Sequence, residues 1–412
     1  MDKKILIIAV VAVVVIAAIA VAVIMMNNGG ESSDAEGLSV VGRVNSEGSG
    51  IILAPGEDPD DYITTSYEMP GLGAKYIYNP EYGIYYIFNT ENWGGKLFAT
   101  PGAATIQHVQ LMQLASLMDL KFVSYTDGTK MNSDTLYYIA GVPSFAEFQN
   151  KLSTAPLSGF IIWEAQVSVA YVSDYPILVL TNDIFYGHTC CIIGASNEYL
   201  EKEGNTMAVF FSVYMQAVDE INEALENPFS ADYQELIKIA KNRVSMPDGL
   251  TDKQKTDAIT NALYNVTYVY ADDKKGSLDK LETDIAELAE SLYDAKQIDK
   301  SAKDLGFKSY EELAEKFVDD SYIKKAVNGS FSPLKDKKTI NVAAISGDVH
   351  QIALWYAIDT GMFADANLDV KVYPQSNGPA VYGLLSNGEA DIGFLGAPPM
   401  TIRCMNAEDI HA

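Results

Sequence analysis

Three loops of small residues, each directly before a predicted helix, are the parts of this sequence best suited to hold a small ligand. They run from Ser346 to His350, from Gly396 to Pro399 and from Thr100 to Thr105. The first turn of a helix has N–H groups without an intrahelical partner, and the helix dipole makes this end positive. We therefore expect these loops to favour carboxylate, sulfonate or nitrate oxygens.

The histidines and cysteines give little ground for catalysis or metal binding. The histidines lack metal-site spacing, and no serine stands in a Gly-x-Ser-x-Gly turn. We expect His108 to be structural, whereas His188 is a loop residue that either lines a cleft or only precedes a strand. Cys190 and Cys191 are expected to be buried as small apolar residues. The sequence thus predicts no catalytic residue, no metal and no cofactor.

The elements that would position these loops are clearest in the C-terminal run from Ile340 to Ala412. Apolar and alternating patterns predict strands at 340–345, 368–372 and 391–395. Helical spacing begins at Asp348, a short helix fits Pro379 to Ser386, and one more helix opens after Gly396. This order, βαβαβα, is typical of a parallel sheet and predicts an α/β fold.

The same C-terminal run resembles solute-binding proteins of the ABC importers that take nitrate, sulfonates, taurine and thiamine precursors. The resemblance rests on His350-Gln351, Gly361-Met362-Phe363, Leu368-Asp369-Val370 and the stretch from Gly393 to Pro399. It implies a two-lobed fold of the type II periplasmic-binding-protein kind, with the solute bound between the lobes. In that family such a run stands at the mature N-terminus and opens the first lobe.

The continuation of that pattern stands at the other end of this chain. Residues 38–51 resemble the family's next strand with its Glu-Gly-Ser turn, and residues 96–108 resemble the start of its second lobe. Writing Ala412 directly before Leu38 restores the family order, which predicts a circular permutation. Chain ends that lie close together at a surface tolerate such a change. A tandem gene cut at an unusual place and a swapped dimer are the alternatives.

The resemblance also implies which residues line the cleft. The hydroxyls of Ser49, Thr100 and Thr105 would form hydrogen bonds, and Trp163 would stack on the ligand or wall it. Thr105 has the alternative of only capping its helix. The full set of expected ligand-binding residues is Ser346, His350, Gln351, Gly396, Ala397, Asn45, Glu47, Gly48, Ser49, Thr100, Ala104, Thr105, Trp163 and Glu164.

Glu47 fits an anionic solute poorly, because a carboxylate in the cleft repels an anion. Either Glu47 caps a turn, or the ligand carries an amine or a cationic ring nitrogen. The sequence leaves both interpretations open. The expected solute is small and polar or anionic, of the sulfonate, nitrate, taurine or pyrimidine type.

Residues 55–92 depart from the family pattern. Two aromatic runs, Tyr76–Tyr78 and Tyr82–Phe88, predict a hairpin that either gates the ligand or covers a sheet edge.

The expected organisation is a membrane anchor or signal at 1–26, a linker at 27–37, part of lobe one with the insertion at 38–92, lobe two at 93–182, a return to lobe one at 183–225, a helical extension and permutation joint at 226–335, and the first βα units of lobe one at 336–412.

The N-terminus predicts a membrane anchor. Lys3 and Lys4 precede an uncharged run from Ile5 to Met26, and as a helix this run is about 33 Å long, enough to cross a bilayer. The lysines should stay inside and the rest of the chain on the extracytoplasmic face; a cleaved signal and a secreted protein are the alternative. The net charge of −26 argues against a nucleic acid partner.

Together these patterns predict a non-enzymatic extracytoplasmic solute-binding protein that delivers its ligand to an ABC permease and its ATPase. An extracellular sensor domain with the same cleft is one alternative, and it would need a separate signalling partner. A less favoured alternative is an enzyme resembling the thiamine-pyrimidine synthases, which carry a cluster of cysteines that holds iron. The Cys190-Cys191 pair falls short of that cluster.

Overall fold

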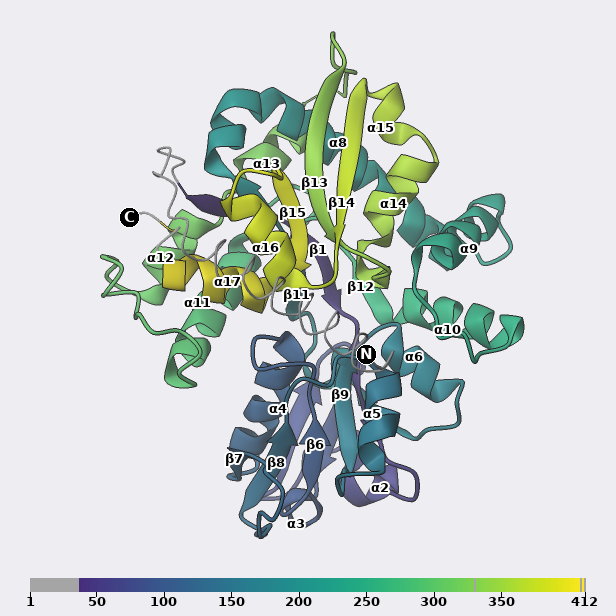
Figure 1. Cartoon of the computed structure of the whole chain (residues 1–412), viewed down its shortest axis with the longest axis vertical. Coiled ribbons are helices and arrows are strands. Elements are labelled where there is room, and N and C mark those ends of the chain that lie inside the picture. The colour runs from purple at the N-terminus through teal and green to yellow at the C-terminus, as the bar shows by residue number, and fades with distance from the viewer. Residues whose placement is uncertain (1–36, 330, 408–409, 411–412) are drawn as a thin grey trace, which may run out of the picture. The chain divides into compact units, whose positions relative to one another are not determined.

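The protein is a mixed α/β chain built on two six-stranded sheets and one three-stranded sheet (Figure 1). The computed structural model describes residues 37–329, 331–407 and 410. The predicted anchor at 1–26 and the linker as far as residue 36 lie outside these residues. Among the helices that are described, none combines the length and the apolar character that crossing a membrane requires.

The first sheet contains strands from both ends of the described chain. Its order is β12 (Val266–Tyr268), β1 (Leu38–Glu47), β11 (Thr189–Ser196), β15 (Ile392–Gly396), β13 (Lys338–Ile345) and β14 (Leu368–Gln375). β13 pairs in parallel with β14 and β15, whereas β11 pairs antiparallel with β1 and β15. The predicted βαβαβα order of the C-terminal run is confirmed, and β11 joins it to β1.

The second sheet is assembled from the middle of the chain. Its order is β10 (Ile177–Leu180), β2 (Ser49–Leu53), β9 (Gly159–Trp163), β6 (Leu97–Ala99), β8 (Thr135–Ile139) and β7 (Lys121–Ser124). β6, β7, β8 and β9 run parallel, and β2 pairs antiparallel with both β9 and the edge strand β10. The chain therefore changes sheets between β1 and β2.

The aromatic insertion forms the third sheet, with β3 (Ile63–Ser66), β5 (Ile84–Phe88) and β4 (Lys75–Asn79) in that order. The hairpin of β4 and β5 is confirmed. Its placement in lobe one is wrong, because the buried rings of Tyr62 and Trp93, 5.5 Å apart, share a core with Phe98 of the second sheet. The break between the two sheet units thus lies at Gly48, and residues 49–92 belong with the second sheet.

Helices cover both large sheets. Those of the second-sheet unit are α2 (Pro59–Tyr62), α3 (Thr90–Trp93), α4 (Ile106–Leu117), α5 (Phe145–Leu152), α6 (Gln166–Tyr171) and α7 (Thr181–Ile184). Those that follow are α8 (Asn197–Glu226), α9 (Ala231–Arg243), α10 (Asp252–Asn265), α11 (Asp279–Asp294), α12 (Tyr310–Phe317), α13 (Ser321–Asn328), the 3-10 turn η1 (Val349–Gln351), α14 (Ile352–Asp359), α15 (Met362–Asp365), α16 (Gly378–Ser386) and α17 (Ala397–Ala407).

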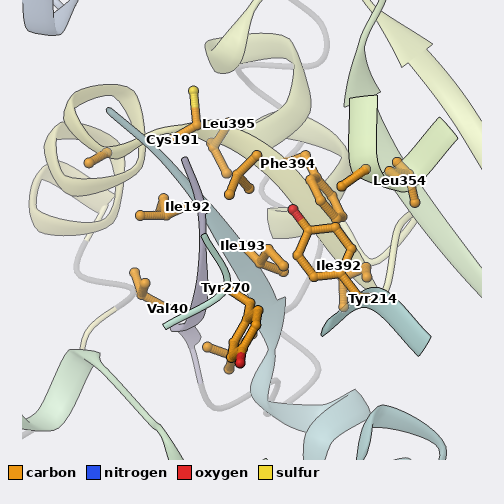
Figure 2. Packing of buried hydrophobic residues seen from close by; sticks show 14 of the residues in the cluster. Val40, Cys191, Ile192, Ile193, Tyr214, Tyr270, Leu354, Ile392, Phe394 and Leu395 are labelled. Atoms are coloured by element: carbon orange, nitrogen blue, oxygen red, sulfur yellow. The ribbon is translucent and has the colours of Figure 1, made fainter. Parts of the chain in front are cut away.

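The core of the first sheet joins residues that are far apart in the sequence. The ring of Tyr214 on α8 packs against Phe394 of β15 with 5.5 Å between ring centroids, beside Ile193 of β11 (Figure 2). Cys190 and Cys191 are buried next to this core, as predicted. Burying such large side chains contributes roughly 1.5–3 kcal/mol each, which holds the two ends of the chain in one sheet.

Candidate functional site

The chain passes from the first sheet to the second at Gly48, which lies between β1 and β2. Its φ is +84°, and a Cβ added there would lie 2.6 Å from Nε2 of His350, so the position requires glycine. The carbonyl oxygen of Gly48 accepts hydrogen bonds from Nε2 of His350 at 3.0 Å and from the backbone N–H of Glu164 at 2.9 Å. We use the name crossing network for Asn45, Glu47, Gly48, Ser49, Glu164, Asp348, His350 and Gln351.

Asp348 and His350 form an ion pair inside the crossing network. Nδ1 of His350 lies 2.6 Å from Oδ1 of Asp348, and the His350 side chain is 2% exposed. Burial alone would lower the pKa of His350, but the adjacent Asp348 carboxylate raises this pKa to about 10. The ring is therefore protonated at neutral pH, and both of its nitrogens donate, one to Asp348 and the other to Gly48.

Two buried carboxylates complete the network. Glu47 accepts hydrogen bonds from the N–H of Gly187 at 2.5 Å and from Oγ1 of Thr267 at 3.0 Å. Glu164 accepts one from Nδ2 of Asn265 at 2.6 Å. Burial raises the pKa of both carboxyl groups above the ordinary glutamate value. Of the two sequence interpretations of Glu47, these contacts match the capping of a turn, because its oxygens are occupied by protein donors.

Ser49, Thr100 and Thr105 of the predicted site are also paired within the protein. Oγ of Ser49 accepts a hydrogen bond from Nε2 of Gln107 at 2.8 Å, and Oγ1 of Thr100 lies 3.1 Å from Nδ1 of His108. Burial lowers the pKa of His108 to about 4, so this ring is neutral and structural. Thr105 caps α4, the alternative considered from the sequence.

The side-chain amides of Asn45 and Gln351 bind the backbone. Nδ2 of Asn45 donates to the carbonyl of Glu47 at 2.9 Å. Oε1 of Gln351 accepts from the N–H of Ile345 at 3.0 Å, and its Nε2 donates to the carbonyl of Phe394 at 3.2 Å. The two Gln351 bonds join this residue to the end of β13 and to the middle of β15. The other predicted residues are the exposed Ser346 and the partly buried Trp163, Ala104 and Gly396.

The three loops predicted to bind an anion offer fewer free N–H groups than the sequence suggests. The Asp348 carboxylate accepts from the N–H of His350 at 3.1 Å, and Oγ1 of Thr105 lies 3.4 Å from the N–H of His108. Helix α17 begins Ala397-Pro398-Pro399, and proline has no N–H. The expectation of three open helix ends is wrong in this respect, because side chains cap two ends and prolines remove donors from the third.

A cavity of about 100 Å³ lies where α4 of the second-sheet unit meets α11, the start of β11 and the start of α17. It adjoins the second passage between the sheets, the segment from α7 to β11, where Gly187 has a φ of +68°. The cavity is lined by Ile106, Val109, Gln110, Gln113, Phe185, His188, Thr189, Asp284, Ile285, Glu287, Leu288 and Ala397.

The buried Gln110 and the partly buried His188 form a polar pair in this lining. Nδ1 of His188 lies 2.7 Å from the carbonyl of Phe185, so Nδ1 carries the proton and Nε2 is left as an acceptor. Nε2 of Gln110 donates to that acceptor at 2.9 Å. This orients the amide and leaves Oε1 of Gln110 without a partner among the described residues, although Gln110 is only 1% exposed. A buried acceptor without a hydrogen bond lowers the free energy of unfolding by about 1–3 kcal/mol.

The fixed charges of the lining are negative. Asp284 and Glu287 are the ionisable residues there besides His188, and the lining includes no lysine or arginine. Burial lowers the pKa of His188 to about 4, so its ring is neutral at neutral pH. Asp284 accepts from Oγ1 of Thr189 at 2.6 Å and is paired with Lys280, which stands outside the lining, at 2.7 Å. This electrostatic environment disfavours nitrate or a sulfonate.

Two shallower depressions, of about 680 and 320 Å³, lie over α6 and α10. They are more open to solvent than the cavity beside Gln110. In the part of the chain that the structure describes, no three His, Cys, Asp or Glu side chains gather as a metal site would require. Because the cavity beside Gln110 is more enclosed than the two depressions, we take it as the candidate site.

Of the predicted ligand-binding residues, all of which the structure describes, Ala397 alone lines this cavity. His188 lies there too, which matches one of the two sequence interpretations of that residue. Gln110 and Asp284 were missed. A signal for Gln110 was present, because it is a polar residue among the buried positions Val109, Leu111 and Leu114 of α4.

Comparison with known proteins gives structural similarity only. No known family model matches the sequence, and no curated protein matches it. The structure is similar to that of the periplasmic nitrate-binding protein NrtA from Synechocystis PCC 6803, with 11% identity, a TM-score of 0.38, and coverage of 73% of this chain and 69% of that one. It is also similar to a protein from Bordetella bronchiseptica RB50, with 14% identity, a TM-score of 0.39, and coverage of 70% and 73%.

Proposed function

We propose that this chain is an extracytoplasmic solute-binding protein that captures a small polar solute between two lobes and delivers it to an ABC permease. In this proposal the first and second sheets are the cores of the two lobes, in a type II periplasmic-binding-protein-like arrangement. Residues 5–26 hold the protein at the membrane, and the solute is released unchanged. The chain acts as a carrier and catalyses no reaction.

The observation that carries this proposal is the composition of the cavity wall. Val109 and Gln110 come from α4 of the second-sheet unit, whereas Asp284 and Leu288 come from α11, which packs with the first-sheet unit. A solute bound there would contact both units at once. Its binding would therefore favour the closed arrangement over an open one, which is how ligand binding drives hinge closure.

The two passages between the sheets support a hinge. Gly48 and Gly187 both have positive φ values, of +84° and +68°, and Glu47 links them by accepting the Gly187 N–H. Hinges absorb changes in φ and ψ at a few residues that lie at the ends of elements. In the proposed mechanism these two glycine positions change conformation while the sheets remain intact.

The circular permutation is part of the same proposal. β1 and β15, at opposite ends of the described chain, are separated in the first sheet by β11 alone. Joining residue 412 to Leu38 would make one continuous run of strands and helices in this sheet. Residue 412 itself lies outside the described residues, so the proposal rests on the strand order. A joined variant that opens at 329–337 should fold and keep solute binding.

The test is a thermal-shift screen with nitrate, taurine, alkanesulfonates, aminopyrimidines, amino acids and small amines, followed by calorimetric titration of each hit. We expect at least one solute to raise the Tm. Val109→Phe, which fills the cavity, should abolish that shift. Leu114→Phe provides the matched control, because Leu114 is buried on the same helix but outside the lining. Absence of any shift in the wild type, or retention of the shift in Val109→Phe, would contradict the proposal.

A further inference from the structure

The unpartnered oxygen of Gln110 defines what a ligand must supply. Its Oε1 is buried, and the His188 tautomer prevents the amide from turning this oxygen toward the imidazole, because Nε2 of His188 has no proton to give. Only a group that donates a hydrogen bond can satisfy it. Nitrate and sulfonate present acceptors alone at neutral pH, so they leave this oxygen unsatisfied.

The charges around the cavity indicate which kind of hydrogen-bond donor the ligand should carry. Asp284 and Glu287 are the acidic residues of the lining. Two cations act on the neighbouring His188 ring, Lys280 and Arg43, and each is paired with a carboxylate, Lys280 with Asp284 and Arg43 with Asp272. The exposed Glu287 is left without a cation among the described residues, so the net charge around the cavity is negative. The neutral ring of His188 adds no positive charge. A cationic donor therefore gains a favourable Coulomb energy in addition to the hydrogen bond, whereas a neutral donor gains the hydrogen bond alone.

The size and the apolar part of the lining limit the rest of the ligand. The volume is about 100 Å³, and Ile106, Val109, Ile285 and Leu288 supply apolar walls. A molecule that fits has a few heavy atoms and a short hydrocarbon portion against these side chains. A ligand as large as a nucleoside or a sugar exceeds this space.

We infer that the cavity between α4 and α11 binds a small primary ammonium ion, with its N–H donated to Oε1 of Gln110 and its charge facing Asp284 and Glu287. This inference rests on the proposed function, because it assigns a ligand class to the same cavity. It narrows the expected solute, which was small and polar or anionic, to a small cation. In Sequence analysis Glu47 was the reason to consider a ligand with an amine, but in this inference Glu47 does not bind the ammonium group.

The experiment measures binding of ethylammonium and 2-hydroxyethylammonium chloride to the full chain by thermal shift and calorimetry. Sodium nitrate, methanesulfonate and acetate at equal ionic strength serve as the anion series. We expect the two ammonium salts to raise the Tm and the anions to have no specific effect. Gln110→Met removes the acceptor at similar volume and should weaken ammonium binding about tenfold or more, since the lost bond is to a charged group.

The matched control is Gln107→Met, because Gln107 is equally buried on the same helix and donates to Ser49 instead of facing the cavity. It should keep ammonium affinity within about twofold. If Gln110→Met does not fold, Asp284→Asn takes its place, and removal of that charge should weaken ammonium binding severalfold. An unchanged affinity in the variant that folds overturns the inference.

The outcomes separate this inference from the proposed function. Binding of anions, or of any other solute that Val109→Phe abolishes, without ammonium binding overturns the inference and leaves the function standing. Ammonium binding that persists in Gln110→Met places the ligand elsewhere and also overturns it. If no solute of either series or of the wider screen binds, water alone satisfies Gln110, and both the inference and the function fail.

Discussion

Two polar regions of this protein, the crossing network around Gly48 and the cavity around Gln110, differ in the charge and the bonding of their histidines. In the crossing network His350 is charged and both of its nitrogens bind protein acceptors. In the cavity His188 is neutral, and Oε1 of Gln110 has no protein partner among the described residues. The crossing network also contains an acceptor without a partner among the described residues, Oδ1 of Asn45, but Asn45 lines none of the three cavities described above. The doubly bonded His350 therefore holds the fold, whereas the unpaired acceptor of Gln110, a residue that lines a cavity, remains available to a ligand.

The largest expected effect is on the crossing network. Gly48→Ala should lower the free energy of unfolding by about 4 kcal/mol, since it combines a positive φ with a clash against His350, whose ring cannot move without breaking its bond to Asp348. Denaturant unfolding checks this. The control is Gly56→Ala, where φ is +94° and nothing lies within 4 Å of the added Cβ, and its cost should be near 1 kcal/mol. Equal losses of unfolding free energy in the two variants would contradict the close packing that we assign to Gly48.

A somewhat smaller effect, with a defined pH dependence, is expected at His350. His350→Gln should cost about 3 kcal/mol at pH 6, because it leaves the buried Asp348 carboxylate without its cation. The pKa of His350 rises from an unfolded value near 6.5 to about 10 in the folded protein. The contribution of the charged His350 to the free energy of unfolding is therefore complete below pH 6.5 and lost as the pH rises through 10. Unfolding curves of the wild type and the variant at pH 6, 8 and 10 should converge; a constant gap would refute the ion pair.

The smallest effect should come from the cavity, with the opposite dependence on pH. Burial lowers the pKa of His188 to about 4, so folding favours its neutral form, and this contribution is present above pH 6.5 and lost as the pH falls through 4. We expect His188→Gln to reduce the acid sensitivity of unfolding by about 1–2 kcal/mol between pH 6.5 and 4, since the residue is only partly buried. A variant that loses stability with acid as steeply as the wild type would contradict this.

Much of the local structure could be predicted from the sequence, and the candidate site largely could not. The alternation of strands and helices after Ile340, and the hairpin of β4 and β5, follow from residue periodicity and turn residues, which act over short distances. The pairing of His350 with Gly48 joins residues 302 positions apart, and that of Gln110 with His188 joins residues 78 apart. Local patterns identify polar residues near strand ends, but they do not reveal which of these groups satisfy one another.

The place of β15 in the first sheet has a consequence for how the protein is made. Ribosomes extend the chain from its N-terminus, and domains generally fold as their sequence emerges. The second sheet has all its strands once Leu180 is synthesised, whereas one edge of β11 waits for β15, which begins at Ile392. An unpaired strand edge invites pairing with other chains. During translation the half of the molecule that starts first is therefore the one finished last, and it is the half most in need of protection from aggregation.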